Sequence, residues 1–523
     1  MTLRIFVSLI SLFITLTCLS QSNPGVEADL QKQAEKDWQN ENYKLAAASY
    51  EKLVAINKDN VEYEYRFGVS NFMAGFDTDK SLQALEPLIG NNSSAIDVMY
   101  WIAQVYMYKY EFADAIDMFN TFITSVGATK TQIAESKRFI EMCQSAIILM
   151  DKPVNVSFEN LGPNINSTSN DFNPYVPQNE KFIIFTSDKK FDQISKMFDQ
   201  NIYISYPEKN GWSFAKPLIY INTEDNEKSV GLSNDGKKLF VCGNFSKAYS
   251  EVDMALCKSK LFKFETVNDW FNPLASKFTT GACISSDNNT VYLSQIRDDS
   301  YGMGDIYVYH KLPNGTWGPS KNLGDVINTP YDESCPSVSP DGKTLYFASK
   351  GHNSMGGYDL FVSFLNEITG EWTKPLNLGH PINTPGDDVT ISFSGNHRYG
   401  YVSSIRKEGL GGLDVYKVIF NDVDEPITVV KGKITLTDET GTHDWKSDNQ
   451  MLDISVYDAK QNLFGKYIYN NNLGRFIAAL PSGEFKLMIQ ANGYQDYSES
   501  ISIMERNLYQ PEIEKIFSLS PKK

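Results

Sequence analysis

The chain has 523 residues, a formal net charge of −16 and a hydrophobic content of 41%. One hydrophobic core rarely grows beyond about 250–300 residues, so this length predicts two to four domains. The chain is acidic and has no cluster of Lys or Arg, which excludes a protein that binds nucleic acid or an anionic lipid surface.

The first 20 residues have the pattern of an export signal. Arg4 provides a short positive region, Ile5 to Leu16 is apolar apart from small hydroxyl residues, and cleavage after Ser20 would leave Gln21 as the mature end. A transmembrane anchor is disfavoured, because the apolar run is shorter than the ~20 residues that a span needs. Cleavage before Cys18 with lipid attachment is the alternative. We expect an exported, periplasmic chain.

Five cysteines remain after cleavage at Ser20, and no two of them have CxxC spacing. They are Cys143, Cys242, Cys257, Cys283 and Cys335. We therefore expect no metal site and no cofactor. An oxidising compartment would permit one disulfide. Cys242 with Cys257 is the first pair to test, because both fall on neighbouring predicted strands.

Residues 21–150 have helical periodicity and a repeat of about 34 residues. Small residues recur at matching places, Ala34, Gly68 and Ala103. The stretch from Asn42 to Asn60 resembles the second helix and exit turn of a tetratricopeptide repeat. Such repeats stack into a solenoid whose concave face often holds a partner's peptide.

The tetratricopeptide resemblance implies a partner-binding groove in this region. The side chains that it places in the groove are Trp38, Tyr65, Tyr100, Gln104 and Met107. The alternative is that these side chains pack between helices, as aromatic and Met residues at helical spacing commonly do.

Residues 151–422 carry a fivefold repeat of short alternating strands and turns. One hydrophobic strand recurs at 184–187, 240–243, 292–294, 346–349 and 401–404, and its second residue advances by 56, 52, 54 and 55. An Asp follows a Gly-rich loop at Asp305, Asp359 and Asp414, and Asp253 holds the matching place. This repeat resembles the TolB-type, WD-like β-propeller unit, and it predicts five blades.

The fifth repeat lacks a fourth strand, and the beginning of the region supplies one. Val154 to Leu161 leads into Asn160-Leu161-Gly162, a motif that closes other repeats as Asn322-Leu323-Gly324 and Asn377-Leu378-Gly379. We therefore expect Val154 to Leu161 to complete the last blade, which would remove the free edges of the sheets.

Acidic residues recur in the loops that lead into the repeats. They are Asp171, Asp225, Asp332, Glu333, Asp387 and Asp388. Gathered at one mouth of a propeller, they could bind a cation or a basic peptide; the alternative is that Asp is simply a good turn residue. The Asp of the third strand is expected to accept hydrogen bonds from the Gly-rich loop and not to bind metal.

Residues 425–523 contain alternating strands and predict a small β-sandwich. Their order, with Gly474-Arg475-Phe476 and Leu480-Pro481-Ser482-Gly483, resembles carboxypeptidase regulatory-like modules, which serve as spacers. That resemblance implies no catalytic residue.

The sequence shows no pattern of known catalytic chemistry. It has no G-x-S-x-G elbow and no P-loop, and its five histidines never fall at H-E-x-x-H spacing. We expect a protein that is not an enzyme.

The order of export signal, helical repeats, propeller and sandwich resembles PorE-like envelope proteins of Bacteroidetes, associated with type IX secretion. The resemblance implies a periplasmic scaffold, associated with the outer membrane, that binds secretion subunits or other envelope proteins. Members commonly end in an OmpA-like domain that grips peptidoglycan. This sequence ends at Lys523 without one, so cell-wall anchoring is not expected. The alternative function is a propeller that binds a small ligand, a glycan or a cation.

Overall fold

The structure is a computed structural model that describes residues 24–523 except 76, 91–96, 192–197, 210, 244–250, 259–260, 265–278, 396, 424–426, 446–451, 504–511 and 523. The expected export signal and Cys18 lie outside the described residues. The chain divides into two compact units, Met1–Lys109 with Asp117–Ser136, and Tyr110–Ile116 with Lys137–Lys523. In the described segments, no helix combines the length and apolarity needed to cross a membrane.

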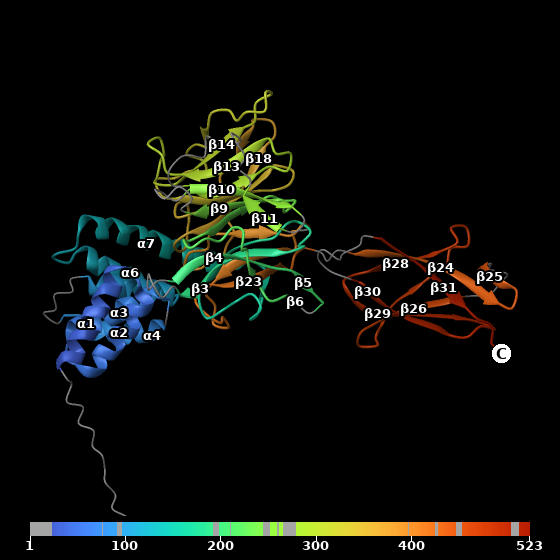
Figure 1. The fold of residues 1–523 in the computed structure, drawn as a ribbon, viewed down its shortest axis with the longest axis horizontal. Helices are drawn as coiled ribbons and strands as arrows, with labels where there is room; N and C mark the ends of the chain where they lie inside the picture. Colours follow the sequence, from blue (N-terminus) through green and yellow to red (C-terminus); the bar gives the residue numbers. More distant parts are fainter. Residues whose placement is uncertain are drawn as a thin grey trace, which may run out of the picture. The chain divides into compact units, whose positions relative to one another are not determined.

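Seven α-helices and one 3₁₀ helix precede the strands in the described part of the chain (Figure 1). They are α1 (Pro24–Gln39), α2 (Tyr43–Ile56), α3 (Val61–Met73), α4 (Thr78–Leu85), η1 (Glu86–Leu88), α5 (Val98–Tyr108), α6 (Phe112–Ile123) and α7 (Lys130–Asp151).

Side-chain caps and small residues fix the first helices. The Asn60 side chain accepts hydrogen bonds from the Glu62 and Tyr63 amides at the start of α3, and Asp77 caps α4 in the same way. Gly68 of α3 faces α4, where an added Cβ would lie 2.6 Å from Leu85 Cγ. A small residue at this predicted position therefore lets two helices approach closely.

The β-rich part of the second unit begins with five small sheets. The first contains β2 (Asp171–Tyr175), β3 (Ile183–Phe191), β4 (Phe198–Ser205) and β7 (Lys216–Pro217), beside a β5 (Pro207–Glu208) and β6 (Gly211–Trp212) hairpin. The second contains β8 (Lys228–Leu232), β9 (Lys238–Gly243), β10 (Glu251–Lys258) and β11 (Leu261–Phe264).

The third to fifth sheets repeat this up-and-down order. The third contains β12 (Thr279–Ile284), β13 (Thr290–Gln295), β14 (Asp305–His310) and β15 (Lys321–Asn322). The fourth contains β16 (Glu333–Val338), β17 (Thr344–Ser349), β18 (Asp359–Asn366), β19 (Glu371–Trp372) and β20 (Leu376–Asn377). The fifth contains β21 (Ile391–Phe393), β22 (Tyr399–Ser404), β23 (Asp414–Phe420) and β1 (Val156–Asn160). Each of the five predicted strands is the second strand of its own sheet.

The predicted role of the segment at Val154 to Leu161 is confirmed at the level of strand pairing. β1 pairs antiparallel with β23, from Val156 opposite Phe420 to Asn160 opposite Tyr416. The first strand of the β-rich part is thus the last strand of its fifth sheet.

Apolar clusters join each sheet to the next among the described residues. Separate clusters are shared by the first and second sheets, the second and third, the third and fourth, and the fourth and fifth. A further cluster packs Tyr401 and Val415 of the fifth sheet against Ile183 and Phe185 of the first. Five sheets are therefore linked by five shared cores.

The C-terminal strands form two further sheets around one core. One contains β24 (Thr428–Asp438), β25 (Gly441–Asp444), β28 (Phe476–Leu480) and β31 (Glu512–Leu519); the other contains β26 (Leu452–Asp458), β27 (Leu463–Tyr467), β29 (Gly483–Ala491) and β30 (Tyr497–Ile503). Phe476 and Phe517 of the first sheet share a cluster with Ile454, Leu487 and Ile501 of the second.

Candidate functional site

Four buried carboxyl groups stand where a connecting loop enters the first strand of a sheet, namely β2, β8, β16 or β21. They are Asp171, Glu227, Glu333 and Asp388, and each is at most 2% exposed. In every case the backbone amide and the hydroxyl of a Ser or Thr four residues earlier donate to the carboxyl group. The Thr329 amide, for example, lies 2.8 Å from Glu333 Oε2. These carboxyl groups therefore hold the loops that precede them in place through hydrogen bonds.

Burial is the largest cause of a raised pKa at all four of these carboxyl groups. It raises the pKa of Glu333 to about 8, against donated hydrogen bonds that act in the opposite direction. The shift of Asp388 also has a contribution from the neighbouring Asp359 carboxyl. The charged form is therefore costly at these positions.

The predicted anionic mouth is not one set of side chains in the structure. Asp171, Glu333 and Asp388 are the buried loop anchors, whereas Asp225 and Asp387 are exposed and Asp332 is half-buried. Asp332 accepts from the Gly304 amide and Asp387 from the Tyr358 amide. This placement favours the turn-forming role over a shared cation site. In the described segments, no group of three or more His, Cys, Asp or Glu side chains is placed to hold a metal ion.

Glu227 was missed from the sequence, although a signal for it exists. Ser167, Thr223, Thr329 and Thr384 each stand four residues before one of the buried acids. An acidic residue four positions after a Ser or Thr identifies all four buried carboxyl groups. A search for acidic residues alone also selects the exposed Asp225.

Asp305, Asp359 and Asp414, which open third strands, accept hydrogen bonds as predicted, whereas the side chain of Asp253 lies outside the described residues. Asp359 accepts from the Met355 and Gly356 amides at 2.8 and 3.1 Å, and Asn377 donates to it at 2.7 Å. Burial raises the pKa of Asp359 to about 7. The carboxyl group thus holds the Gly-rich loop and the fourth strand together.

The same network recurs in the fifth sheet with Asn160, the last residue of β1, and Asn166, which follows it. Asn160 donates to Asp414 at 2.8 Å, and Asn166 exchanges hydrogen bonds of 2.8 and 3.0 Å with the backbone of Val415. In the third sheet, Asn322 donates to Asp305 and Asn328 exchanges hydrogen bonds with the backbone of Ile306. In the fourth sheet, Asn377 donates to Asp359 and Asn383 exchanges hydrogen bonds with the backbone of Leu360.

Two of the predicted groove residues in the helical unit are buried. Met107 is 1% exposed, and Tyr100 is 8% exposed with its hydroxyl donating to Glu135 at 2.9 Å. Their burial favours the alternative of packing between helices.

The other three predicted groove residues are half-buried. The Arg66 guanidinium lies 4.3 Å from the centre of the Trp38 ring, and the Tyr65 hydroxyl donates to Asp97 at 2.8 Å. Gln104 has the same intermediate exposure. A groove that includes these three side chains stays a prediction.

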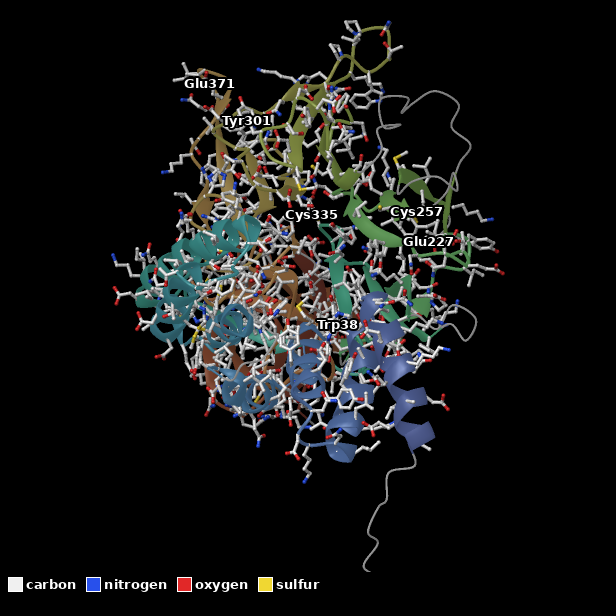
Figure 2. All side chains as sticks on the ribbon, turned by 90° about the vertical axis from the view of Figure 1, so that its left-hand side faces the viewer. Trp38, Glu227, Cys257, Tyr301, Cys335 and Glu371 are labelled. Carbon is white, nitrogen blue, oxygen red and sulfur yellow. The ribbon has the colours of Figure 1, made fainter. Side chains whose placement is uncertain are left out.

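The first strands of neighbouring sheets, β8, β12 and β16, approach each other closely. A Cβ added to Gly281 of β12 would lie 2.6 Å from the backbone nitrogen and Cα of Cys335 in β16, and one added to Gly231 would meet the Ala282 carbonyl oxygen. Cys335, labelled in Figure 2, has a positive φ of 48° and is buried. Glycine is required here by the close approach of two backbones.

The suggested pairing of Cys242 with Cys257 is wrong in this structure, where no disulfide joins the two. Cys242 of β9 lies opposite Val252 of β10, and Cys257 is five residues further along that strand. At about 3.4 Å per residue this places the two far beyond disulfide reach.

Four exposed apolar side chains lie in the segment between β6 and β8 and at the start of β11. Phe214, Ile219, Tyr220 and Leu261, here called the β-unit patch, are 68%, 72%, 51% and 47% exposed. The Lys263 ammonium lies 4.3 Å from the centre of the Tyr220 ring, which brings Lys263 of β11 beside Tyr220. Sequence patterns did not identify this patch, because its residues resemble strand and turn positions.

Comparison with known proteins gives no close relative. No protein-family model and no curated protein sequence matches the chain. Similar solved structures include TolB from Acinetobacter baumannii, at 16% identity and a TM-score of 0.29 over 49% of this chain and 56% of that one. A protein assigned as TolB from Agrobacterium tumefaciens has 13% identity and a TM-score of 0.30 over 62% and 98%. A glycosyl hydrolase from Bacteroides ovatus has 12% identity and a TM-score of 0.31 over 48% and 84%. Similarities this weak carry no functional argument.

Proposed function

We propose that the chain is a scaffold that binds protein partners at the cell envelope and catalyses no reaction. In this proposal the five sheets are the blades of a TolB-like propeller closed by β1, the helices are tetratricopeptide repeats, and the C-terminal sheets are a regulatory-like spacer. The sequence resemblance to PorE-like proteins supports a periplasmic place near the outer membrane and partners in a secretion assembly of the type IX kind.

The β-unit patch is the observation that carries partner binding. Soluble proteins seldom expose several large apolar side chains together, and such clusters commonly mark protein-binding surfaces. Phe214 and Ile219 have more than two thirds of their surface in water. Aromatic side chains such as Phe214 and Tyr220 are also the residues that interfaces favour.

The use of acidic residues supports the non-enzymatic part of the proposal. Asp171, Glu227, Glu333 and Asp388 accept hydrogen bonds from their own loops, and Asp359 accepts them from a Gly-rich loop. A carboxyl group occupied in this way is poorly placed to transfer a proton to a substrate.

Comparative capture tests the proposal. The native chain, a triple variant with Phe214→Ser, Ile219→Ser and Tyr220→Ser, and Ile368→Ser as a matched control would be cross-linked in producing cells. Ile368 is 96% exposed and lies on the fourth sheet, between β18 and β19. We expect one or more envelope proteins to be lost from the triple variant alone. Identical recoveries from all three would contradict binding at the patch, and turnover in a broad hydrolase screen would contradict the non-enzymatic role.

A further inference from the structure

A small cavity lies near the far end of the first strands of the sheets, away from the buried carboxyl groups at which those strands begin. In the first sheet, Asp171 begins β2, and the cavity is lined by Tyr175, Val176 and Gln178 at and just beyond the end of that strand. The rest of the lining comes from the end of β8 and the turn after it, the end of β16 and the turn after it, Tyr346 of β17, and β21 with the turn after it. The cavity is therefore formed jointly by the first, second, fourth and fifth sheets.

The lining of this cavity is polar but carries no fixed charge. Of its fourteen residues none is Asp, Glu, Lys or Arg. Its one histidine, His397, has a pKa lowered by burial, which favours the neutral imidazole at neutral pH. An anion or a metal cation would find no charged partner in this lining, so the chemistry favours an uncharged ligand.

Four side chains around the cavity have hydrogen-bonding groups that make no hydrogen bond to another described residue. They are the Gln178 amide, the Ser337 and Tyr346 hydroxyls and the His397 ring. Neighbouring polar groups, in contrast, are engaged: Ser392 bonds the backbone of Val176. The free groups comprise both donors and acceptors, as the hydroxyl groups of a sugar require.

One wall of the cavity is aromatic. The Phe393 ring centre lies 4.7 Å from that of Tyr346 and 5.3 Å from that of His397. Phe393, Tyr346 and His397 are each half-buried, so part of each ring remains accessible from outside the cavity. Flat apolar surface beside hydrogen-bonding groups suits a pyranose ring, which has an apolar face and a polar rim.

The enclosed volume limits how the ligand enters. It measures about 30 Å³, room for roughly two water molecules. A hydroxyl or hydroxymethyl group fits this space, whereas a whole sugar ring does not. The ring must therefore lie outside, against the aromatic wall.

We propose that this cavity is a binding site for a neutral sugar. One hydroxyl or hydroxymethyl group enters between Gln178 and Ser337, and the ring rests on Phe393 and Tyr346. This site goes beyond protein binding and does not depend on the β-unit patch.

Ligand-observed saturation-transfer NMR and calorimetry on the full chain test the site, with D-glucose, D-galactose and N-acetyl-D-glucosamine as probes. At least one probe is expected to bind saturably at millimolar concentration. Phe393→Ala is expected to weaken that binding tenfold or more, and Phe364→Ala to leave it unchanged. Phe364 is the matched control, since it is 45% exposed on the fourth sheet and does not line the cavity.

Gln178→Ala and Tyr346→Phe provide second variants if Phe393→Ala unfolds, and each is expected to weaken binding at least threefold. No saturable binding of any probe, or binding that all of these variants retain, would overturn the proposal. Tighter binding of D-glucuronate than of D-glucose would also overturn it, because the lining offers no cation for a carboxylate.

Discussion

Asn160 connects the beginning of the β-rich part to its end, so replacing it measures how firmly β1 belongs to the fifth sheet. Its side chain donates to Asp414 at 2.8 Å and accepts from the Gly162 amide at 2.8 Å and from Asn166 at 2.9 Å. A hydrogen bond to a carboxylate contributes about 1.5–3 kcal/mol and a neutral one about 0.5–1.5 kcal/mol. Asn160→Ala is therefore expected to lower the free energy of unfolding by roughly 4 kcal/mol.

Two matched variants calibrate this expectation inside the same molecule. Asn322 and Asn377 make the equivalent three bonds in the third and fourth sheets, with partners much nearer in the sequence. Urea unfolding followed by tryptophan fluorescence, to which the buried Trp212 contributes, would compare all three alanine variants. Similar losses in the free energy of unfolding for all three variants would support the assignment of β1 to the fifth sheet. An Asn160→Ala loss below about 1 kcal/mol, beside full losses at Asn322 and Asn377, would refute the pairing of β1 with β23.

Three further predictions concern buried groups. Burial raises the folded-state pKa of Glu333 to about 8, so this group's contribution to stability is intact below its unfolded pKa and is lost as pH rises through 8. The free energy of unfolding of Glu333→Gln should therefore rise by about 4 kcal/mol relative to that of the native chain between pH 5 and pH 9 in urea titrations. A difference between the two chains that stays constant with pH would contradict this. Gly281→Ala should lower the free energy of unfolding by about 1–3 kcal/mol, because the new Cβ meets the Cys335 backbone, and unchanged stability in the same titration would contradict the close approach. Cys242 and Cys257 should both be alkylated after non-reducing denaturation, and a peptide linking the two in mass spectra would contradict the strand register.

Regular features of the fold could be predicted from the sequence. The turn chemistry of each repeat is local, so the second strands of five sheets were found correctly from their spacing. The use of Val154 to Leu161 in the fifth sheet followed from a missing strand at one end and a surplus strand at the other, and strand pairing confirms it. The Asp359 type of loop anchor was also predicted, because a Gly-rich loop leaves amides that need an acceptor.

Features that depend on three-dimensional neighbours were not predictable in this way. Asp225 and Glu227 are two residues apart in one loop, and only the fold decides that Glu227 is buried and Asp225 exposed. Tyr100 and Met107 have helical spacing that suits either a groove or a core, and the structure buries both. The two strands that carry Cys242 and Cys257 are adjacent, which suggested the pair. The distance between the two sulfur atoms, however, depends on the register in which the strands are paired.

The most direct test of the scaffold role is the affinity of a purified partner recovered by the capture experiment. Its dissociation constant would be measured by calorimetry against the native chain, the triple variant at Phe214, Ile219 and Tyr220, and Ile368→Ser. Truncation of interface aromatic side chains commonly costs 2 kcal/mol or more, so we expect at least about thirtyfold weaker binding for the triple variant and native affinity for Ile368→Ser. Equal affinities for all three chains would contradict the claim that the β-unit patch binds protein partners.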